Sequence, residues 1–134
     1  MKRILNLTLM ALLLLTALSC KKVVTKEGIQ GTWELRHLAG GQVPGFDPNF
    51  KKGNGNIYKF EGQTYTRYEK GKITESGTFT LEKADAVINA SKANGLIKLK
   101  PSEDEYYINL SGNRLTIFIG IIAADGGEMM YERE

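Results

Sequence analysis

Residues 56–68 read Asn-Ile-Tyr-Lys-Phe-Glu-Gly-Gln-Thr-Tyr-Thr-Arg-Tyr, and this stretch decides the class of fold. Two runs of β-prone residues, 56–60 and 64–68, flank the short connection Glu61-Gly62-Gln63. A glycine inside such a connection is typical of a β-hairpin, because glycine readily adopts the positive φ angles that tight turns require. The stretch therefore predicts two antiparallel strands joined by a tight turn.

The same pattern of short β-prone runs and turn residues continues along the chain. Further turn residues stand at Lys70-Gly71, Ser111-Gly112-Asn113 and Asp125-Gly126-Gly127. Consecutive strands that are joined by short turns usually pair as neighbours in one sheet. The other strands that we expect are residues 31–39, 73–81, 96–100, 105–110, 114–122 and 128–133.

The two ends of this meander decide the architecture. An open sheet leaves two edges whose backbone groups lack partners, and closure into a barrel removes both edges. Residues 29–134 therefore predict one all-β domain, an antiparallel up-and-down β-barrel of about eight strands. One alternative stays open, because residues 82–95 contain either a further strand at 86–90 or a short helical turn.

The composition agrees with one small globular domain. The chain has 134 residues, of which 42% are hydrophobic and 25% charged, and 15 glycines stand against 3 prolines. This length fits one domain, and many glycines with few prolines suit many tight turns. The formal charge of +3 becomes nearly neutral once Lys2 and Arg3 are removed with the signal described below. We therefore expect no nucleic-acid partner.

The first part of the chain predicts export. Lys2 and Arg3 precede an apolar run over residues 5–15, which is shorter than the ~20 residues that span a bilayer. Small residues and the only cysteine follow, in Thr16-Ala17-Leu18-Ser19-Cys20. This order is typical of a secretory signal with its cleavage site, and a lone cysteine forms no internal disulfide. The alternatives are an ordinary signal peptide with a chance cysteine and an uncleaved anchor.

The stretch that ends at Cys20 resembles the lipobox of bacterial lipoproteins. The resemblance implies cleavage before Cys20 and fatty-acid (palmitate-type) acylation of its thiol and new amine, which anchor it stably in membrane lipid. We expect a signal peptide at residues 1–19, lipidated Cys20 with a tether to residue 28, and the barrel at 29–134. Lys21 and Lys22 follow with no aspartate after the cysteine. By resemblance to proteobacterial sorting rules, this favours the outer membrane of the cell envelope.

Four motifs follow one another along the body: Gly31-Thr32-Trp33, Tyr58-Lys59-Phe60, Gly77-Thr78-Phe79-Thr80 and Tyr131-Glu132-Arg133. Their order resembles the short lipocalin-like lipoproteins common in Bacteroidetes. The resemblance covers about residues 29–134 and implies that Gly31, Trp33 and Arg133 close the barrel base, with the arginine over the tryptophan. Eight strands bring Trp33 and Arg133 to the same end, where an arginine–indole contact contributes roughly 0.5–2 kcal/mol. A ninth strand would separate them, so we prefer eight.

Residues 40–55 form a long connection with an apolar character that is unusual for a loop. Apolar side chains on a loop are expected to pack against something. We therefore predict that Val43, Phe46 and Phe50 form a lid over the barrel mouth. His37 alternates with Trp33 and is expected to point inward near the mouth. With Tyr68, it completes the candidate ligand-binding residues.

Motifs for catalysis and for metal binding are missing from the sequence of the expected domain. His37 is the only histidine and Cys20 the only cysteine, so we expect neither a His/Cys metal site nor a cofactor. Glu103-Asp104-Glu105 lacks the ligand spacing of a calcium loop and is interpreted as a solvated turn. No phosphate loop, dinucleotide fingerprint or nucleophile motif stands in the body, and we therefore expect a protein that is not an enzyme.

Two hypotheses for the function remain. In the first, the barrel binds a small hydrophobic ligand under the lid. In the second, the barrel is filled, and the protein is a non-catalytic structural or protein-interaction lipoprotein that contacts envelope partners. An eight-stranded barrel is just wide enough either to be filled by side chains or to hold one small ligand, so both hypotheses fit the fold.

Overall fold

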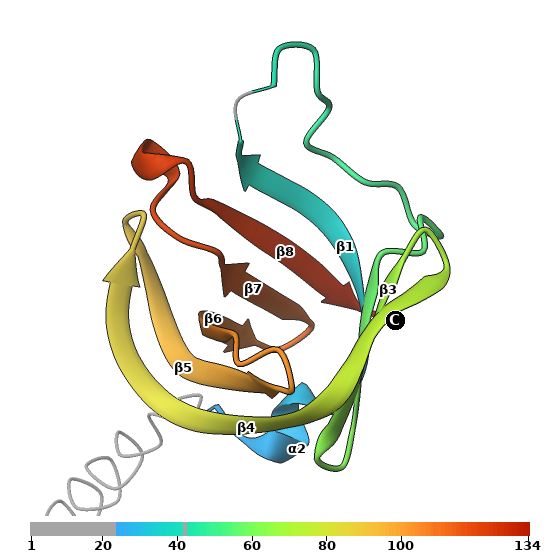
Figure 1. Ribbon diagram of the computed structural model, residues 1–134. Coiled ribbons are helices and arrows are strands. Elements are labelled where there is room, and N and C mark those ends of the chain that lie inside the picture. The colour runs from blue at the N-terminus through green and yellow to red at the C-terminus, as the bar shows by residue number, and fades with distance from the viewer. Residues whose placement is uncertain (1–23, 42) are drawn as a thin grey trace, which may run out of the picture.

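The computed structural model describes residues 24–41 and 43–134, and it forms a closed antiparallel barrel (Figure 1). Each strand pairs with its neighbour in the sequence, and β8 pairs with β1 to complete the circle. The expected signal peptide, Cys20, Lys21, Lys22 and position 42 of the expected lid lie outside the described residues. The elements are α2 Lys26–Ile29, β1 Gly31–Gly40, β2 Ile57–Glu61, β3 Thr64–Glu69, β4 Lys72–Ile88, β5 Ser91–Lys100, β6 Glu105–Ser111, β7 Arg114–Phe118, the 3-10 helix η2 Ile122–Ala124 and β8 Gly127–Arg133.

This architecture confirms the predicted all-β, up-and-down barrel and its eight strands. The hairpin that decides the fold class pairs Phe60 with Tyr65 and Ile57 with Tyr68. Gly62 supplies the positive φ angle of 60° in its turn. Neither described helix has the length and apolar character that crossing a bilayer would require.

The hairpin of β4 and β5 differs from the expectation. β4 continues to Ile88 and β5 begins at Ser91, so residues 82–95 form neither a separate strand nor a helical turn. Asn89 and Ala90 make the two-residue turn with φ angles of 51° and 63°, as a hairpin turn with two positive φ values requires. A β-bulge between Lys83 and Ala86 interrupts the pairing of the two strands. β7 also differs, because it ends at Phe118 and not at residue 122.

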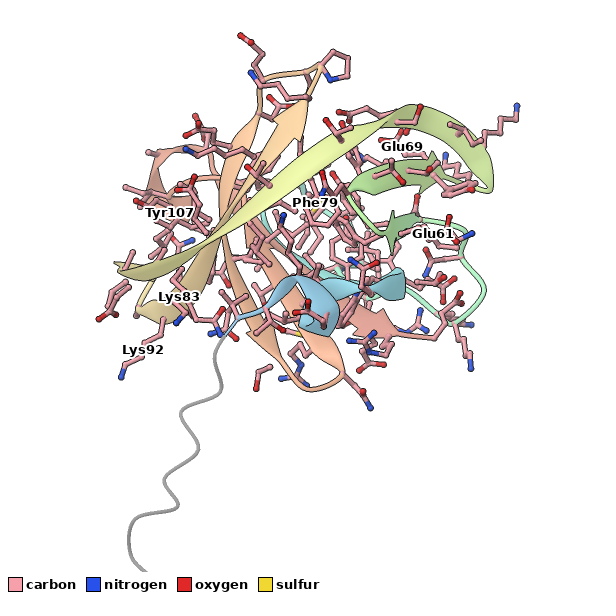
Figure 2. All side chains as sticks on the ribbon, turned by 90° about the horizontal axis from the view of Figure 1, so that it is seen from below. Glu61, Glu69, Phe79, Lys83, Lys92 and Tyr107 are labelled. Atoms are coloured by element: carbon pink, nitrogen blue, oxygen red, sulfur yellow. The ribbon has the colours of Figure 1, made fainter. Side chains whose placement is uncertain are left out.

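Alternating side chains of the strands fill the barrel. The largest fully buried side chains include Trp33, Phe60 and Tyr65, and they pack in one hydrophobic cluster. Figure 2 shows Phe79 among the central side chains and Lys92 at the outside of the molecule. Burial of each large apolar side chain contributes about 1.5–3 kcal/mol, so this cluster is the main source of stability.

One end of the barrel, which we call the base, is closed by the contact that the sequence analysis expects. The guanidinium carbon of Arg133 lies 4.2 Å from the ring centroid of Trp33. The Trp33 indole N–H donates to the carbonyl of Ile29 at 2.7 Å, and Arg133 Nη2 donates to the carbonyl of Gly28 at 2.6 Å. At Gly31, with φ of 117°, a Cβ atom would lie 3.0 Å from Arg133 Nη1. A side chain at this position would therefore crowd the arginine.

The packed domain begins earlier than the expected boundary at residue 29. Val24 is 6% exposed and belongs to the core cluster, and the single helical turn α2 is capped by the Thr25 hydroxyl. Val24 and Ile29 thus cover the base, where the sequence predicts a tether through residue 28. One helical turn is too short to show a helical period, which explains why the sequence pattern did not reveal it.

Candidate functional site

The long connection between β1 and β2 lies beside β1 and extends beyond the end of this strand (Figure 1). β2 pairs only with residues 31–34, so the second half of β1 needs another partner on this side. The Phe50 N–H donates to the Arg36 carbonyl and the Leu38 N–H donates to the Pro48 carbonyl, each at 2.9 Å. The loop therefore replaces a strand along this edge, which reduces the number of unpaired backbone groups.

The buried side chain of Glu34 holds the end of this loop through hydrogen bonds. Its side chain is 1% exposed and accepts hydrogen bonds from the N–H groups of Gly53 at 3.0 Å and Gly55 at 3.2 Å. Arg36 forms an ion pair with the same carboxylate. Burial disfavours the charged form, but the hydrogen bonds and Arg36 outweigh it and hold the pKa of Glu34 below its usual value. Glu34 was not among the residues that the sequence analysis selected.

The apolar residues at the start of the loop line a shallow cleft at the rim, the barrel end opposite the base. This rim cleft has a volume of about 260 Å³ and is lined by Leu38, Val43, Phe46 and Ile119, together with Asp125 and several glycines. Val43 is 66% exposed and Phe46 is 45% exposed. Phe50 is half-buried, packs against the barrel core and has its ring centroid 6.3 Å from that of Phe46. Val43 and Phe46 of the expected lid thus share one site.

His37 and Tyr68 lie elsewhere. A β-bulge between Leu35 and His37 shifts the pairing of β1 with β8, so that Leu38 and not His37 stands opposite the half-buried Met129 of the interior. His37 therefore faces the outer wall, in contrast to the inward orientation that simple alternation predicts, and lies 3.0 Å from Asn49 Oδ1 through its Nδ1. Tyr68 stands opposite Ile57, on the face of β3 that points away from the core.

The barrel interior contains a polar cluster that the sequence analysis missed. The Tyr65 hydroxyl donates to Glu75, whose other oxygen lies 3.9 Å from Arg67 Nη1. The Arg67 guanidinium lies 5.8 Å from the ring centroid of the buried Tyr58. Arg67 and Glu75 are half-buried, and both stand in strands whose alternating pattern is otherwise ordinary. Only the register of β3 against β4 reveals that they meet.

Burial controls the protonation of these tyrosines. It raises the pKa of Tyr65 to about 12, and the hydrogen bond to Glu75 adds to this effect. Burial likewise raises the pKa of Tyr58 and of Tyr131 well above the ordinary tyrosine value. The hydroxyls of Tyr65 and Tyr131 donate hydrogen bonds in the interior, to Glu75 and to the sulfur of Met129 respectively.

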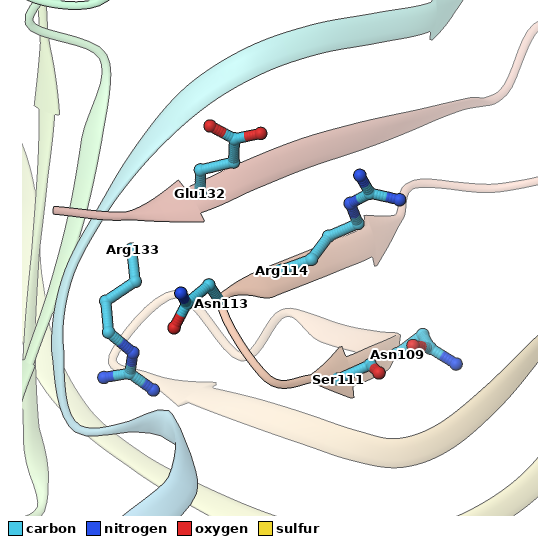
Figure 3. A pocket seen from close by; sticks show the side chains of 6 residues that line it. All are labelled: Asn109, Ser111, Asn113, Arg114, Glu132 and Arg133. Carbon is cyan, nitrogen blue, oxygen red and sulfur yellow. The ribbon is translucent and has the colours of Figure 1, made fainter.

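Two further hollows lie on the outer wall of the barrel. The larger, of about 650 Å³, is surrounded by side chains of β6, the following turn, β7 and β8 (Figure 3). The smaller, of about 320 Å³, lies between β5 and the outward faces of β7, β8 and β1, and we call it the wall cleft. Asn109 and Arg114 line both hollows, so the two adjoin. Residues of the wall cleft include His37, Ser91, Lys92, Phe118, Glu128 and Met130.

Two further findings concern metal binding and similarity to known proteins. Within residues 24–41 and 43–134, no three acidic, histidine or cysteine side chains lie together in a way that could hold a metal ion. Comparison with protein-family models, with curated proteins and with solved structures gave no match to this chain.

Proposed function

We propose that this chain is a lipoprotein of the cell envelope whose lipocalin-like barrel binds a small apolar or amphipathic molecule. The order of the positive residues, the apolar run and Cys20 supports export and lipid attachment, with the outer membrane as the location. The order of barrel motifs and the contact between Trp33 and Arg133 support the lipocalin-like character. Catalysis has no part in this proposal.

The observation that carries the binding function is the rim cleft. Its main side chains are apolar, and both Val43 and Phe46 are exposed to solvent. A concave group of exposed apolar side chains favours an apolar ligand, because binding removes their surface from water. The volume of about 260 Å³ limits the enclosed part of the ligand to a small group. A longer molecule would leave its polar end in solvent.

The position of the rim cleft suits a protein held at its base. Val24 and α2 lie at the base, whereas Gly40 and Gly127, which line the rim cleft, pair with each other at the opposite end. An anchor that precedes Val24 would therefore hold the base nearer to the membrane and leave the rim accessible. This arrangement supports capture of a molecule from the surrounding solution or from a partner protein.

Binding is tested with N-phenyl-1-naphthylamine, a neutral apolar probe that becomes fluorescent away from water. The full-length protein, purified in a mild detergent below its micelle-forming concentration, is expected to bind the probe saturably. Phe46→Ser should weaken binding by about tenfold, which corresponds to the loss of about 1.4 kcal/mol of contact. The matched control is Ile73→Ser, because Ile73 is 64% exposed and lies outside the rim cleft. Equal binding by both variants would contradict the proposal.

The anchor needs its own experiment. Replacement of Cys20 by Ala should move the protein from the membrane fraction to the soluble fraction, because the acylated thiol would be lost. Ser19→Ala, at the neighbouring position, serves as the control and should stay with the membranes. Retention of the Cys20→Ala variant on membranes would exclude lipid attachment through this residue.

The second candidate, a non-catalytic interaction lipoprotein, is favoured by the packing of the interior. Trp33, Phe60 and Tyr65 are fully buried inside the barrel and fill the space that a hollow barrel would offer. In that case Val43, Phe46 and Ile121, all exposed, would contact an envelope protein instead of a small molecule. Native mass spectrometry separates the candidates, because a small ligand adds a mass of its own that disappears on denaturation.

A further inference from the structure

The β4–β5 hairpin crosses the outer wall of the barrel and is fixed there at its tip. The Asn89 side chain donates to the Gly120 carbonyl at 3.1 Å and accepts from the Ile122 N–H at 2.9 Å. Figure 1 shows the tip of this hairpin beside the segment of η2. Nearer the base, Asn109 Nδ2 donates to the Lys92 carbonyl at 2.7 Å. The hairpin thus covers the wall cleft and is attached on two sides of it.

The floor of the wall cleft is apolar. Phe118 is 4% exposed, yet it follows the inward-facing Ile117 and points to the outer side of β7, apart from the core cluster. Met130, on the outward side of β8, lies in the same wall. The small exposed part of the Phe118 ring, together with Met130, gives the cleft an apolar surface that a ligand can contact.

An acidic group stands at one end of this floor. Glu128 lies opposite Phe118 in the pairing of β7 with β8, and it lines the wall cleft. Its Oε1 is buried and has no hydrogen-bond partner. No ion pair among the described residues involves Glu128. Buried carboxylate oxygens are normally bonded, so this group is complementary to a cationic donor.

Basic groups stand toward the other end. Arg114 begins β7, four residues before Phe118, which corresponds to roughly 13 Å along an extended strand. Lys92 lines the same cleft from the hairpin. Within the described part of the chain, neither Arg114 nor Lys92 takes part in an ion pair. This end is therefore complementary to an anionic group, above all to a carboxylate that Arg114 can bind with two hydrogen bonds.

We propose that the wall cleft binds a short peptide, with its free amine at Glu128, its free carboxylate at Arg114 and an apolar side chain on Phe118. The three features are a cation site at Glu128, an anion site at Arg114, and an apolar floor that begins at Phe118 beside Glu128 and continues through Met130 toward Arg114. Extended chain covers at most ~3.3–3.6 Å per residue, so about four residues span this length of strand, and three suffice where the long Arg114 side chain reaches toward the ligand. The adjoining hollow of about 650 Å³ leaves room beyond Arg114 for a bulky last residue. Ala39 lines both this cleft and the rim cleft, but Glu128, Arg114 and Phe118 line only the wall cleft of these two, so variants at these residues test it separately.

Isothermal titration calorimetry with three probes tests the charges of the ligand. The probes are the tripeptide alanyl-leucyl-alanine, its N-acetylated form and its C-terminal amide, each added to the full-length protein in mild detergent. The free tripeptide should bind, and each capped form should bind about tenfold more weakly. If the amide binds as tightly as the free tripeptide, the carboxylate is not recognised and the cleft is a simple cation site. If the acetylated form binds as tightly as the free tripeptide, the amine is not recognised and the cleft is a simple anion site. Either result, or no binding of any probe, would overturn the proposal.

Two variants assign the ends. Glu128→Gln should weaken binding of the free tripeptide about tenfold and leave the N-acetylated form unchanged, because that form has no amine to lose. Arg114→Gln should likewise weaken binding of the free tripeptide about tenfold and leave binding of the amide unchanged, because the amide has no carboxylate to lose. Glu27→Gln and Lys72→Gln are matched controls, since both residues are exposed and line none of the three hollows. If each variant weakens binding of the free and the capped forms alike, the amine does not lie at Glu128 and the carboxylate does not lie at Arg114. The proposed orientation of the peptide is then wrong.

The hairpin supplies a further check that does not alter a charge. Asn89→Ala removes both hydrogen bonds at the tip and should weaken binding of the free tripeptide several-fold, because the hairpin no longer holds the cleft closed. Phe46→Ser, at the rim cleft, should leave tripeptide binding unchanged. Failure of tripeptide binding with retained binding of N-phenyl-1-naphthylamine would overturn this inference and leave the proposed function intact.

Discussion

The base and the rim of this barrel use their side chains in opposite ways. At the base, Trp33 is fully buried and its indole N–H donates a hydrogen bond to the carbonyl of Ile29. Arg133 covers the Trp33 ring and donates a hydrogen bond to the carbonyl of Gly28. At the rim, Val43 and Ile121 are more than 60% exposed. The buried contacts at the base stabilise the fold, whereas the exposed apolar groups at the rim contribute little to its stability. Covering these exposed groups with a binding partner lowers the free energy, because their surface leaves water. Under the proposed function, stability and ligand binding therefore depend on different ends of the barrel.

The largest expected effect is at the base. Trp33→Ala removes a fully buried aromatic side chain and should lower the free energy of unfolding by about 3–5 kcal/mol. Urea unfolding followed by circular dichroism measures this change. Any variant that remains folded should still bind the apolar probe at the rim. A loss below about 1 kcal/mol would mean that the base is not the main source of stability.

Glu34, between the base and the rim, should have the next largest effect. Glu34→Gln weakens charge-assisted hydrogen bonds to Gly53, Gly55 and Arg36, and should cost about 1.5–3 kcal/mol at neutral pH. The pKa of Glu34 is lowered in the folded state, so its contribution is present above the unfolded value of 4.5. This stabilising contribution is lost as the pH falls through the lowered pKa of Glu34 in the folded protein.

This sign of the pH dependence can be measured directly. Urea midpoints of the unaltered protein should fall on acidification below the unfolded pKa of Glu34, and the fall should be smaller in Glu34→Gln. Exposed Glu27, changed to Gln in the same way, is the control. Parallel curves for the unaltered protein and Glu34→Gln would show that the carboxylate does not fasten the loop.

Arg133→Lys should have a smaller effect at the same base. The lysine keeps the charge but loses the planar stacking on Trp33 and the forked hydrogen bonds to Gly28 and Gln30. The expected loss is about 1–2 kcal/mol, measured by urea unfolding. A lysine variant as stable as the original would show that only the positive charge matters there.

The smallest effect on stability is expected at the rim. Phe46→Ser changes a 45% exposed side chain and should shift the free energy of unfolding by less than about 0.5 kcal/mol, while it weakens probe binding. The same urea experiment and the probe titration, made on one preparation, compare the two quantities. A strong loss of stability would remove the distinction between base and rim.

Much of the fold follows from local sequence signals. The hairpin turn at Gly62 and the alternation in the strands are visible in short windows. The resemblance to lipocalin-like proteins implied the stacking of Arg133 on Trp33, and this expected contact favoured eight strands over nine. The β4–β5 turn was missed because Asn89-Ala90 contains no glycine or proline, although both residues adopt positive φ angles. The orientation of His37 was missed because one bulge in β1 reverses the alternation.

The candidate sites were less predictable than the fold. The apolar composition of the loop predicted Val43, Phe46 and Phe50 as ligand-binding residues, and of these Val43 and Phe46 line the rim cleft. The wall cleft depends on Asn89 reaching Gly120, which is 31 residues away in the sequence. The cluster of Arg67 and Glu75 depends on the register of two strands. Contacts of this kind have no signature in a single sequence window.

The pairing of β1 with β8 has a consequence for the kinetics of folding. The contact of Arg133 with Gly28 joins residues 105 positions apart, so closure of the barrel brings together nearly the two ends of the described domain. The entropy lost in closing such a long loop grows only with the logarithm of its length, but it must be lost before the contact is gained. We therefore expect the hairpins to form early and the seam between β1 and β8 to form late, with refolding in roughly milliseconds to seconds.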